Sequence, residues 1–361
     1  MNEKKSALII GFPRLLARAL AVEGLHSKTV RTVYLLHSEH MTAAAETFRA
    51  SPPAGIRKRL TLLSGDLSSV NLKLSGAEVR RLSSEVTHII HADSDVTSPE
   101  KELRASLTAL NQIFSLARDC QRLNRICIFS SAFVSGNRSG IVREEELDQG
   151  QLLRTVYEEA MMARERAARF VMPRLPITIF RPSAMVGRWK DDDHAGLTEG
   201  PTYLLSLMMK LPIDMPFVVP GSGFVPFNIV PVEYVVKAAW ALAMEPSARG
   251  RTFHLTDPNP VSARQAFELL ADRTNRPRPV SAAIATRLLR PVLRLPGLGR
   301  LLRNTVTVLD DLSQNVTYCC AGTLELLADT DIRCPPFDAY ADTLVTWMAG
   351  IERRHRPTLD G

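Results

Sequence analysis

Several features that would place this chain in a specialised class of proteins are missing from its sequence. The cysteines are odd in number, and their spacing is not that of a zinc site or a disulfide framework, so we expect reduced thiols. The apolar run near the start, residues 7–10, is too short for a signal sequence or a membrane span. Long charge blocks and internal repeats are also absent. We therefore expect a cytoplasmic, globular protein.

Acidic residues are missing between Asp272 and Asp310, a stretch that holds eight arginines. Within it, the segment from Arg287 to Arg303 mixes leucine and arginine at near-helical spacing. A basic amphipathic helix of this kind can contact an anionic membrane surface or an acyl-carrier protein. The alternative is a pair of short helices packed on the domain with the arginines in water. Because interleaved aromatic residues are lacking, we expect no nucleic-acid partner.

The first half of the chain alternates strand-like and helix-like segments. Hydrophobic residues make up 45% of the 361 residues, enough for one large core and a smaller lobe. The predicted strands are 7–10, 33–36, 60–63, 87–90, 126–129 and 177–180, and the predicted helices are 13–23, 41–48, 100–122 and 157–171. This alternation predicts an α/β fold, a Rossmann-type doubly wound parallel sheet with right-handed crossovers.

Beyond Pro182 the alternation becomes less regular, and prolines and glycines interrupt it. The sequence predicts helices over 232–244, 263–273 and 340–350 and a strand over 252–255. We therefore expect a dinucleotide-binding-type domain over residues 1–185. Residues 186–361 are expected to form a smaller, mostly helical C-terminal lobe of substrate-binding type, interleaved with the first domain.

A set of motifs in a fixed order carries a family resemblance. Residues 129–136 read Phe-Ser-Ser-Ala-Phe-Val-Ser-Gly, Tyr157 follows, and residues 179–183 read Ile-Phe-Arg-Pro-Ser. Further matches are 65–67, 89–92, 230–232 and 253–255. In this order they resemble the extended short-chain dehydrogenase/reductases, in particular the thioester-reductase and fatty-acyl-reductase branch with its male-sterility-type NAD-binding domain. The chain is identified as a divergent member, which implies an NADP or NAD cofactor and an acyl-type ligand.

The phosphate-binding loop departs from the pattern that the resemblance implies. Three glycines are expected in the spacing G-x-x-G-x-x-G, and residues 11–17 read Gly-Phe-Pro-Arg-Leu-Leu-Ala. Arg14 places a side chain where the backbone should approach the phosphates, and Pro13 lacks an N–H group. An arginine can also bind phosphate through its side chain, so both outcomes stay open for dinucleotide binding. The cofactor-binding residues implied by the resemblance are Gly11, Phe12, Pro13, Arg14, Leu15, His37, Asp66, Leu67, Ala92, Asp93, Pro182 and Ser183.

Two of these positions carry unusual residues. His37 stands where the branch often has an arginine for the 2′-phosphate of NADP, and a histidine is a weaker substitute at neutral pH. Asp93 follows the predicted fourth strand, where a carboxylate would repel a diphosphate unless it turns into solvent or caps a helix.

The catalytic residues implied by the resemblance are a serine, a tyrosine and a lysine four positions after the tyrosine. Ser131 and Tyr157 occupy the first two positions, but Met161 occupies the third. Methionine carries no charge, so it cannot lower the pKa of the tyrosine. Arg164 is the nearest cation, and we expect it to point away from the Tyr157 face of the helix. The run from Asp191 to His194 is expected to face water rather than bind a metal.

Three functions remain open. The first is a catalytically impaired relative that binds an acyl or nucleotide-like ligand, or a protein partner, in the inherited cleft. The second is an active NAD(P)H-dependent oxidoreductase acting on an acyl thioester, aldehyde or ketone. The third is a membrane-peripheral binding protein that uses the segment from Arg287 to Arg303. The resemblance also implies a possible homodimer.

Overall fold

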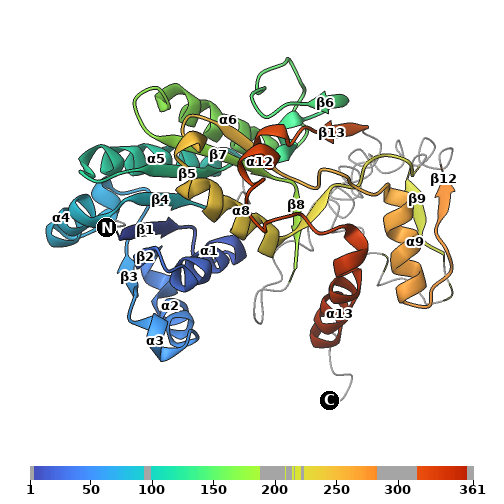
Figure 1. The fold of residues 1–361 in the computed structure, drawn as a ribbon, viewed down its shortest axis with the longest axis horizontal. Coiled ribbons are helices and arrows are strands. Elements are labelled where there is room, and N and C mark those ends of the chain that lie inside the picture. The colour runs from blue at the N-terminus through green and yellow to red at the C-terminus, as the bar shows by residue number, and fades with distance from the viewer. Residues whose placement is uncertain are drawn as a thin grey trace.

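A parallel sheet runs through the centre of the computed structural model, which describes residues 4–92, 99–187, 208, 214, 216–220, 223–282 and 315–355 (Figure 1). The strands of this sheet are β1 (Lys5–Ile10), β2 (Val30–His37), β3 (Leu60–Ser64), β4 (His88–His91), β5 (Arg125–Phe129), β7 (Ile177–Pro182) and β11 (Thr252–Leu255). Their spatial order is β3-β2-β1-β4-β5-β7-β11, and every pair of neighbours is parallel. The expected Rossmann-type doubly wound sheet is confirmed.

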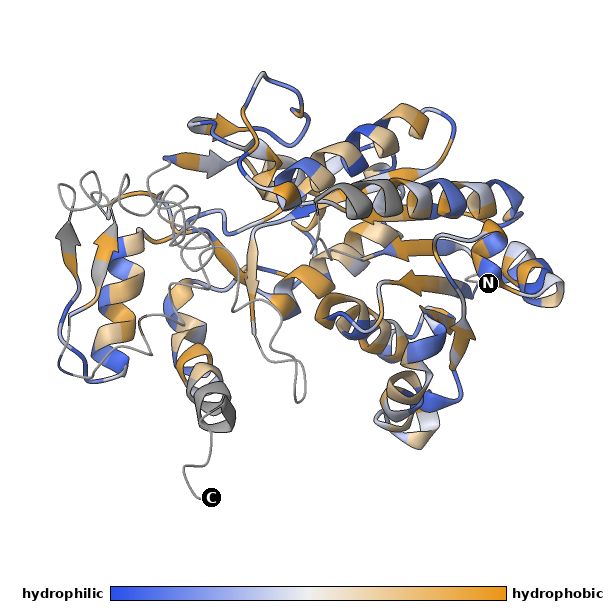
Figure 2. Ribbon diagram, turned by 180° about the vertical axis from the view of Figure 1, so that it is seen from behind, coloured by the Kyte–Doolittle hydropathy of each residue, from blue (hydrophilic) through white to orange (hydrophobic). Residues whose placement is uncertain are grey.

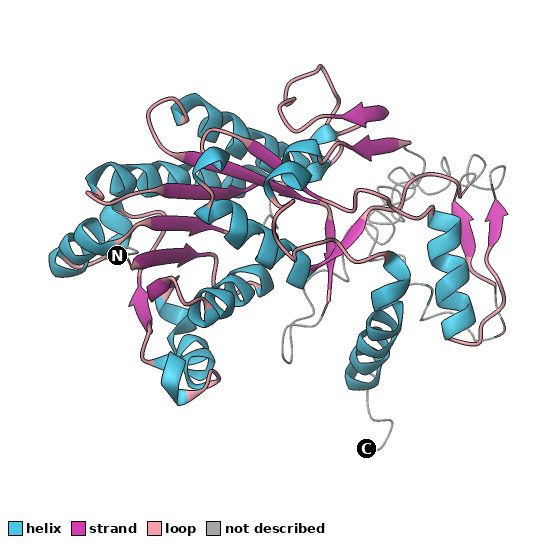
Figure 3. Ribbon diagram, viewed as in Figure 1, coloured by secondary structure: helices cyan, strands magenta, loops and turns pink. Residues whose placement is uncertain are grey.

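Helices cover both faces of the sheet (Figure 3). The larger ones in the first part of the chain are α1 (Leu15–His26), α2 (Thr42–Ala50), α4 (Gly76–Glu85), α5 (Pro99–Asp119), α6 (Val156–Val171) and α8 (Val232–Met244). The strands are almost fully buried, because helices α1 and α8 cover one face and α4, α5 and α6 the other. The strands accordingly read as continuous apolar runs, seen as orange arrows between amphipathic helices in Figure 2.

Short elements connect these layers or pair outside the main sheet. They are η1 (Glu39–Met41), α3 (Ala54–Arg57), η2 (Val70–Lys73), η3 (Ala132–Ser135), β6 (Gly140–Val142), β8 (Ala184–Val186), β10 (Ile229–Pro231), η4 (Pro246–Ala248), β13 (Val316–Tyr318) and α12 (Ala321–Leu326). Strand β8 pairs with β10 and β6 pairs with β13, each in parallel. The second pair brings a C-terminal strand beside the segment that follows β5.

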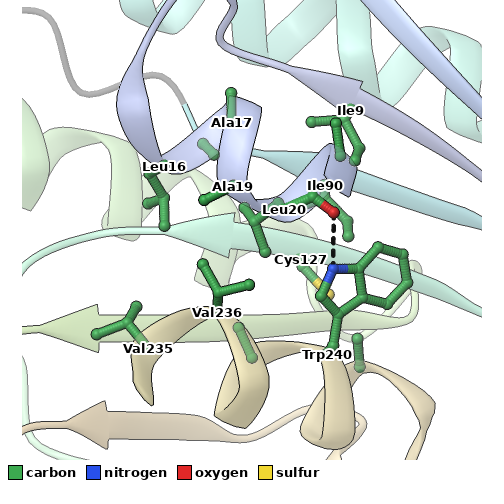
Figure 4. Packing of buried hydrophobic residues seen from close by; sticks show 14 of the residues in the cluster. Ile9, Leu16, Ala17, Ala19, Leu20, Ile90, Cys127, Val235, Val236 and Trp240 are labelled. Atoms are coloured by element: carbon green, nitrogen blue, oxygen red, sulfur yellow. Dashed lines mark hydrogen bonds between the residues drawn. The ribbon is translucent and has the colours of Figure 1, made fainter. Parts of the chain in front are cut away.

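The contact between α1 and α8 closes one face of the sheet (Figure 4). The indole Nε1 of Trp240 donates a hydrogen bond to the carbonyl oxygen of Leu20 at 2.9 Å. Gly24 allows the close approach, since a Cβ atom at this position would lie 2.7 Å from the Trp240 ring. The position of α1, and therefore of its N-terminus, is thus set by a helix that lies more than two hundred residues later.

A smaller lobe is built from α9 (Ala263–Arg273), α13 (Phe337–His355) and the two-stranded sheet of β9 (Val218–Pro220) and β12 (Val280–Ala282). Its own apolar cluster includes the stacked pair Phe217 and Phe267, whose ring centroids are 4.6 Å apart. The expected C-terminal lobe is confirmed as a helical region beside the sheet. In the part of the chain that the structure describes, no helix is long and apolar enough to cross a membrane.

A buried ion pair joins the carboxyl ends of two central strands to α6. The guanidinium of Arg181, at the end of β7, donates to both carboxylate oxygens of Glu165 at 2.6 and 2.9 Å, and both side chains are 0% exposed. The hydroxyl of Ser130, which follows β5, donates to the same carboxylate at 2.8 Å. These bonds hold α6 against β5 and β7 at the edge of the sheet where ligands bind in this fold.

Replacing Glu165 by glutamine should destabilise the protein strongly. The Glu165→Gln variant keeps the volume but leaves the buried Arg181 guanidinium without an opposite charge, which costs about 3–5 kcal/mol. Urea unfolding of Glu268→Gln is the matched control, because the partly exposed Arg264–Glu268 pair contributes at most about 0.5 kcal/mol. Equal midpoints for the two variants would contradict the structural role of the buried pair.

Arg181 also contacts His254 of β11, a histidine that the fold keeps neutral. Nδ1 of His254 lies 2.8 Å from the carbonyl oxygen of Cys319, and Nε2 lies 3.3 Å from a guanidinium nitrogen of Arg181. This geometry fits a neutral ring that donates through Nδ1 and accepts through Nε2. Burial, and then the charge of Arg181, lower the pKa of His254 from 6.5 to about 3.

The free energy of unfolding should therefore fall as the pH is lowered from 6.5 toward about 3. In this window the unfolded chain binds a proton at His254 and the folded chain does not, so this group contributes a slope of about 1.4 kcal/mol per pH unit. We expect His254→Gln to be less stable than the wild type at neutral pH, with a smaller loss of stability over this window. Parallel stability profiles for the two proteins would contradict the assignment.

Candidate functional site

The turn between β1 and α1 joins a strand to a helix N-terminus, the arrangement of a phosphate-binding loop, although two of the three expected glycines are replaced. Gly11 has a φ of +127°, a conformation that favours glycine. The backbone N–H of Arg14 donates to the carbonyl oxygen of Gly11 at 2.9 Å, and α1 begins at the next residue. Arg14 makes no side-chain cap, so no cap from this residue covers the amides of the first turn. Ala17, at the third glycine position, is fully buried under the sheet.

A cavity of about 530 Å³ opens beside this turn. Its walls come from the carboxyl ends of β1, β2 and β3 and from the segments that follow them. Seven of the residues predicted to bind a cofactor line it, namely Gly11, Phe12, Pro13, Arg14, His37, Asp66 and Leu67. Leu15 begins α1 next to them and is not part of the lining. The structure therefore brings the predicted loop, second-strand and third-strand residues together in one place.

Six further residues line this cavity. Ile10, Leu36 and Gly65 belong to the predicted strands or to the 65–67 motif, whereas the sequence did not indicate Ser38, His40 and Met41. All three follow His37 at the carboxyl end of β2. Since ligands in parallel sheets lie beyond the strand ends, the whole segment after the second strand was the available signal.

The polar groups of the cavity are mainly basic or neutral. Nδ1 of His37 lies 2.9 Å from the carbonyl oxygen of Ser38, and Nε2 of His40 lies 3.3 Å from the Ser38 hydroxyl. The Asp66 carboxylate accepts hydrogen bonds from Ser68 and Ser69, and these bonds lower the pKa of Asp66. Both oxygens of Asp66 accept hydrogen bonds within the turn, so the Asp66 carboxylate stabilises the turn. Arg14 adds a positively charged side chain to the lining of the cavity.

A second group of predicted residues lies at the carboxyl ends of β4, β5 and β7. Ala92 is fully buried, and Ser131 is 2% exposed with its hydroxyl accepting a hydrogen bond from the backbone N–H of Phe133 at 3.2 Å. Pro182 ends β7, and the buried hydroxyl of Ser183 has no hydrogen-bond partner among the described residues. Asp93 lies outside the described residues, as does the run from Asp191 to His194. None of these four described residues lines the cavity beside β1.

Tyr157 lies in the first turn of α6, which is capped by the Thr155 hydroxyl. It is partly buried against an apolar cluster that includes Val134, Leu147 and Met161. Met161 itself is 0% exposed. The lysine position of the resemblance is thus occupied by a side chain that belongs to the core.

The prediction that Arg164 points away from the Tyr157 face is wrong. A guanidinium nitrogen of Arg164 lies 3.8 Å from the Met161 sulfur, and Arg164 is 2% exposed. The side chain donates to the Ser106 hydroxyl of α5 at 2.9 Å and to the carbonyl oxygen of Phe129 at 3.3 Å. Seven residues make almost two turns at about 3.6 residues per turn, so positions 157 and 164 share one side of the helix.

Arg164 therefore places a buried positive charge directly beneath the lysine position. Its charge is felt at the end of β4, where burial and then the proximity of Arg164 hold the pKa of His91 well below its ordinary value. Arg164 and the adjacent Glu165 were both overlooked as determinants of this site. The available signal was that these two charged residues lie between the apolar residues 160–162 and 167–168 of the helix.

A lysine at position 161 should not be accommodated easily. Its ammonium would enter the cluster around Met161 close to the Arg164 guanidinium, so we expect Met161→Lys to lose at least about 2 kcal/mol of stability. Met161→Leu keeps an apolar side chain of similar volume and should lose less than about 1.5 kcal/mol. Urea unfolding of both variants measures the difference. A Met161→Lys protein as stable as Met161→Leu would show that the two charges do not meet.

In the described residues, no group of three or more His, Cys, Asp or Glu side chains is arranged to hold a metal ion. The adenosine end of a dinucleotide fits the structure, because a cavity with a strand–turn–helix junction is present there. The nicotinamide end does not fit in the same way, since the residue expected to hold its ribose is the buried Met161.

Comparisons with known proteins agree with this architecture. The family model described as "Male sterility protein", an NAD-binding domain, matches residues 15–239. The terminal R domain of the myxalamid PKS-NRPS biosynthetic pathway has 23% sequence identity and a TM-score of 0.77, over 99% of this chain and 93% of that domain. No curated protein matches the chain.

Two further solved structures have the same fold. One is a thiolation-reductase di-domain from an archaeal non-ribosomal peptide synthetase, with 16% identity and a TM-score of 0.75 over 97% of this chain and 76% of that one. The other is the reductase domain of a non-ribosomal peptide synthetase from Mycobacterium tuberculosis, with 17% identity and a TM-score of 0.67 over 97% of this chain and 93% of that one. At these identities the likeness establishes the fold and leaves the activity to the site residues.

Proposed function

Because the chain belongs to the male sterility protein family, whose fold binds NAD(P), we propose that it is a thioester-reductase-like protein that binds a ligand in the inherited cleft and has lost efficient hydride transfer. The ligand would be of the adenine-nucleotide or acyl type. The observation that carries the proposal is the burial of Met161 beside Arg164 at the position where the resemblance implies a lysine. Without a mobile ammonium in the cleft, nothing at this position orients a nicotinamide ribose or favours the ionised form of Tyr157.

The contacts of Arg164 support this proposal. The Arg164 guanidinium is tied to α5 through Ser106 and to the end of β5 through the Phe129 carbonyl oxygen. A side chain held by bonds to two neighbouring elements serves the packing of α5, α6 and the sheet. Its hydrogen bonds would have to break before it could enter the cleft as a catalytic cation.

An active NAD(P)H-dependent oxidoreductase is the second candidate. It is favoured by the retention of Ser131 and Tyr157 at the strand end and helix start where the resemblance places them. The positive charge of Arg164 near the Met161 side chain could then act on Tyr157 from within the protein. The predicted contact of segment 287–303 with a membrane or an acyl carrier lies outside the described residues.

Assay of nicotinamide oxidation separates the two candidates. Purified protein is mixed with NADH or NADPH and a panel of acyl thioesters and aldehydes of different chain lengths, and the loss of the reduced cofactor is followed by absorbance. We expect wild-type rates no higher than those of Tyr157→Phe, because position 161 carries methionine in place of the cationic lysine. Turnover by the wild type that falls at least about a hundredfold in Tyr157→Phe, the usual contribution of a general acid, would establish the active oxidoreductase instead.

A further inference from the structure

The cavity beside β1 and the position of Met161 lie at different parts of the sheet edge. The cavity is lined from β1, β2 and β3, whereas Ser131 and Tyr157 follow β5 on the other side of β4. We propose that this cavity recognises an adenine mononucleotide, adenosine mono- or diphosphate, as a complete ligand rather than as one half of a dinucleotide. The inference rests on the proposed loss of hydride transfer, since only then is the nicotinamide half dispensable.

The base and ribose would lie against the apolar part of the wall. Ile10 of β1, Leu36 of β2 and Met41 of η1 provide apolar surface, and Leu67 adds to it from the segment after β3. Polar groups of Ser38 and His40 lie on the same wall, within hydrogen-bond distance of each other. An apolar slot with a few polar groups is the usual form of a small-molecule site, and this one has the volume for a nucleotide of moderate size.

The phosphate end is where this chain favours a short ligand. A bridging diphosphate needs close approach to the backbone of the turn, and here Arg14 adds a long side chain while Pro13 contributes no N–H donor. A terminal phosphate has no such need. It carries more charge than a bridging one and offers several oxygens to a guanidinium, which binds such groups through paired hydrogen bonds.

Arg14 therefore changes what the turn selects rather than only weakening it. Its side chain lines the cavity at the N-terminus of α1, so its charge adds to that of the helix dipole at the same point. The second half of a dinucleotide would have to pass this side chain and would then meet Met161, whose side chain has no hydrogen-bond donor. Binding energy is thus concentrated at the adenosine phosphate.

Calorimetric titration with ADP, AMP, NADH and NADPH tests the inference. For the wild type we expect ADP to bind at least as tightly as NADH, because Met161 gives the nicotinamide ribose no hydrogen bond. Arg14→Gln should weaken ADP binding about tenfold, the loss of one charge-assisted contact of about 1.4 kcal/mol. Arg49→Gln, which removes an exposed arginine of α2 outside the cavity lining, is the control and should leave binding unchanged.

Arg14→Gly provides an independent arm, since it returns a glycine to the turn. We expect it to shift the preference from ADP toward NADH by about tenfold or more, as backbone approach to a bridging diphosphate becomes possible. Three results would overturn the inference: NADH binding about tenfold tighter than ADP in the wild type, equal ADP binding by wild type and Arg14→Gln, or no nucleotide binding by the folded protein. Turnover of NADH in the oxidation assay would instead contradict the proposed function, so the two failures are distinguishable.

Discussion

The buried pair of Arg181 and Glu165 is the interaction on which the candidate site depends. It is fully buried, it is bidentate, and it receives the Ser130 hydroxyl as a third partner. A charge pair of this kind is stabilising only when its hydrogen bonds are satisfied, and here Arg181 also donates to the carbonyl oxygen of Glu146 at 2.6 Å. The network fixes the start of the segment after β5, the inner face of α6 and the end of β7 relative to one another.

A second carboxylate extends this arrangement toward the C-terminal part of the chain. Glu144 is buried and accepts hydrogen bonds from the backbone of His254 at 2.9 Å, from the backbone of Gly322 at 2.8 Å and from the Thr323 hydroxyl at 2.7 Å. Together with the pairing of β6 and β13, it ties α12 to the strand edge that carries Ser131. The framework around the catalytic position is thus well bonded, and the catalytic residue that departs from the resemblance is Met161.

The framework and the altered positions are separate, so the proposed loss of hydride transfer requires no change of fold. The phosphate loop, the last residue of β2 and the lysine position are all altered, yet the strands keep the Rossmann-type order. Ala17, by contrast, has to be small, since it is buried against the sheet, and it remains small. Packing therefore constrains Ala17, whereas the proposed loss of hydride transfer concerns position 161.

Much of the fold could be predicted from the sequence, because its strands are continuous apolar runs and its helices have clear periodicity. The helices over 232–244 and 263–273 and the strand over 252–255 coincide with the observed bounds. Helix α4 was overlooked although Ser75 and Glu78 form a capping box; its sequence is mostly polar and exposed, and it was not read as a helix. The short pairs β6–β13 and β9–β12 join distant segments of three residues each, which local patterns cannot indicate.

The candidate site was predictable only in part. Seven of the predicted residues, at the ends of β1, β2 and β3, line one cavity because parallel strands end at a common edge, and their role in cofactor binding stays a prediction. The environment of Met161 was not predictable, since it depends on the tertiary contacts of Arg164 with Ser106 and Phe129. Helical geometry alone, however, places Arg164 on the same side of α6 as Tyr157, because the two residues are almost two turns apart.

The central claim is that the cleft binds the adenine end of a dinucleotide and not its nicotinamide end. Saturation-transfer NMR of NADH in the presence of the protein measures this directly, because protons in close contact with the protein receive saturation and distant ones do not. We expect strong saturation of the adenine and adjoining ribose protons and little saturation of the nicotinamide ring protons. Equal saturation at both ends would contradict it, since the nicotinamide would then be held in the cleft beside Tyr157.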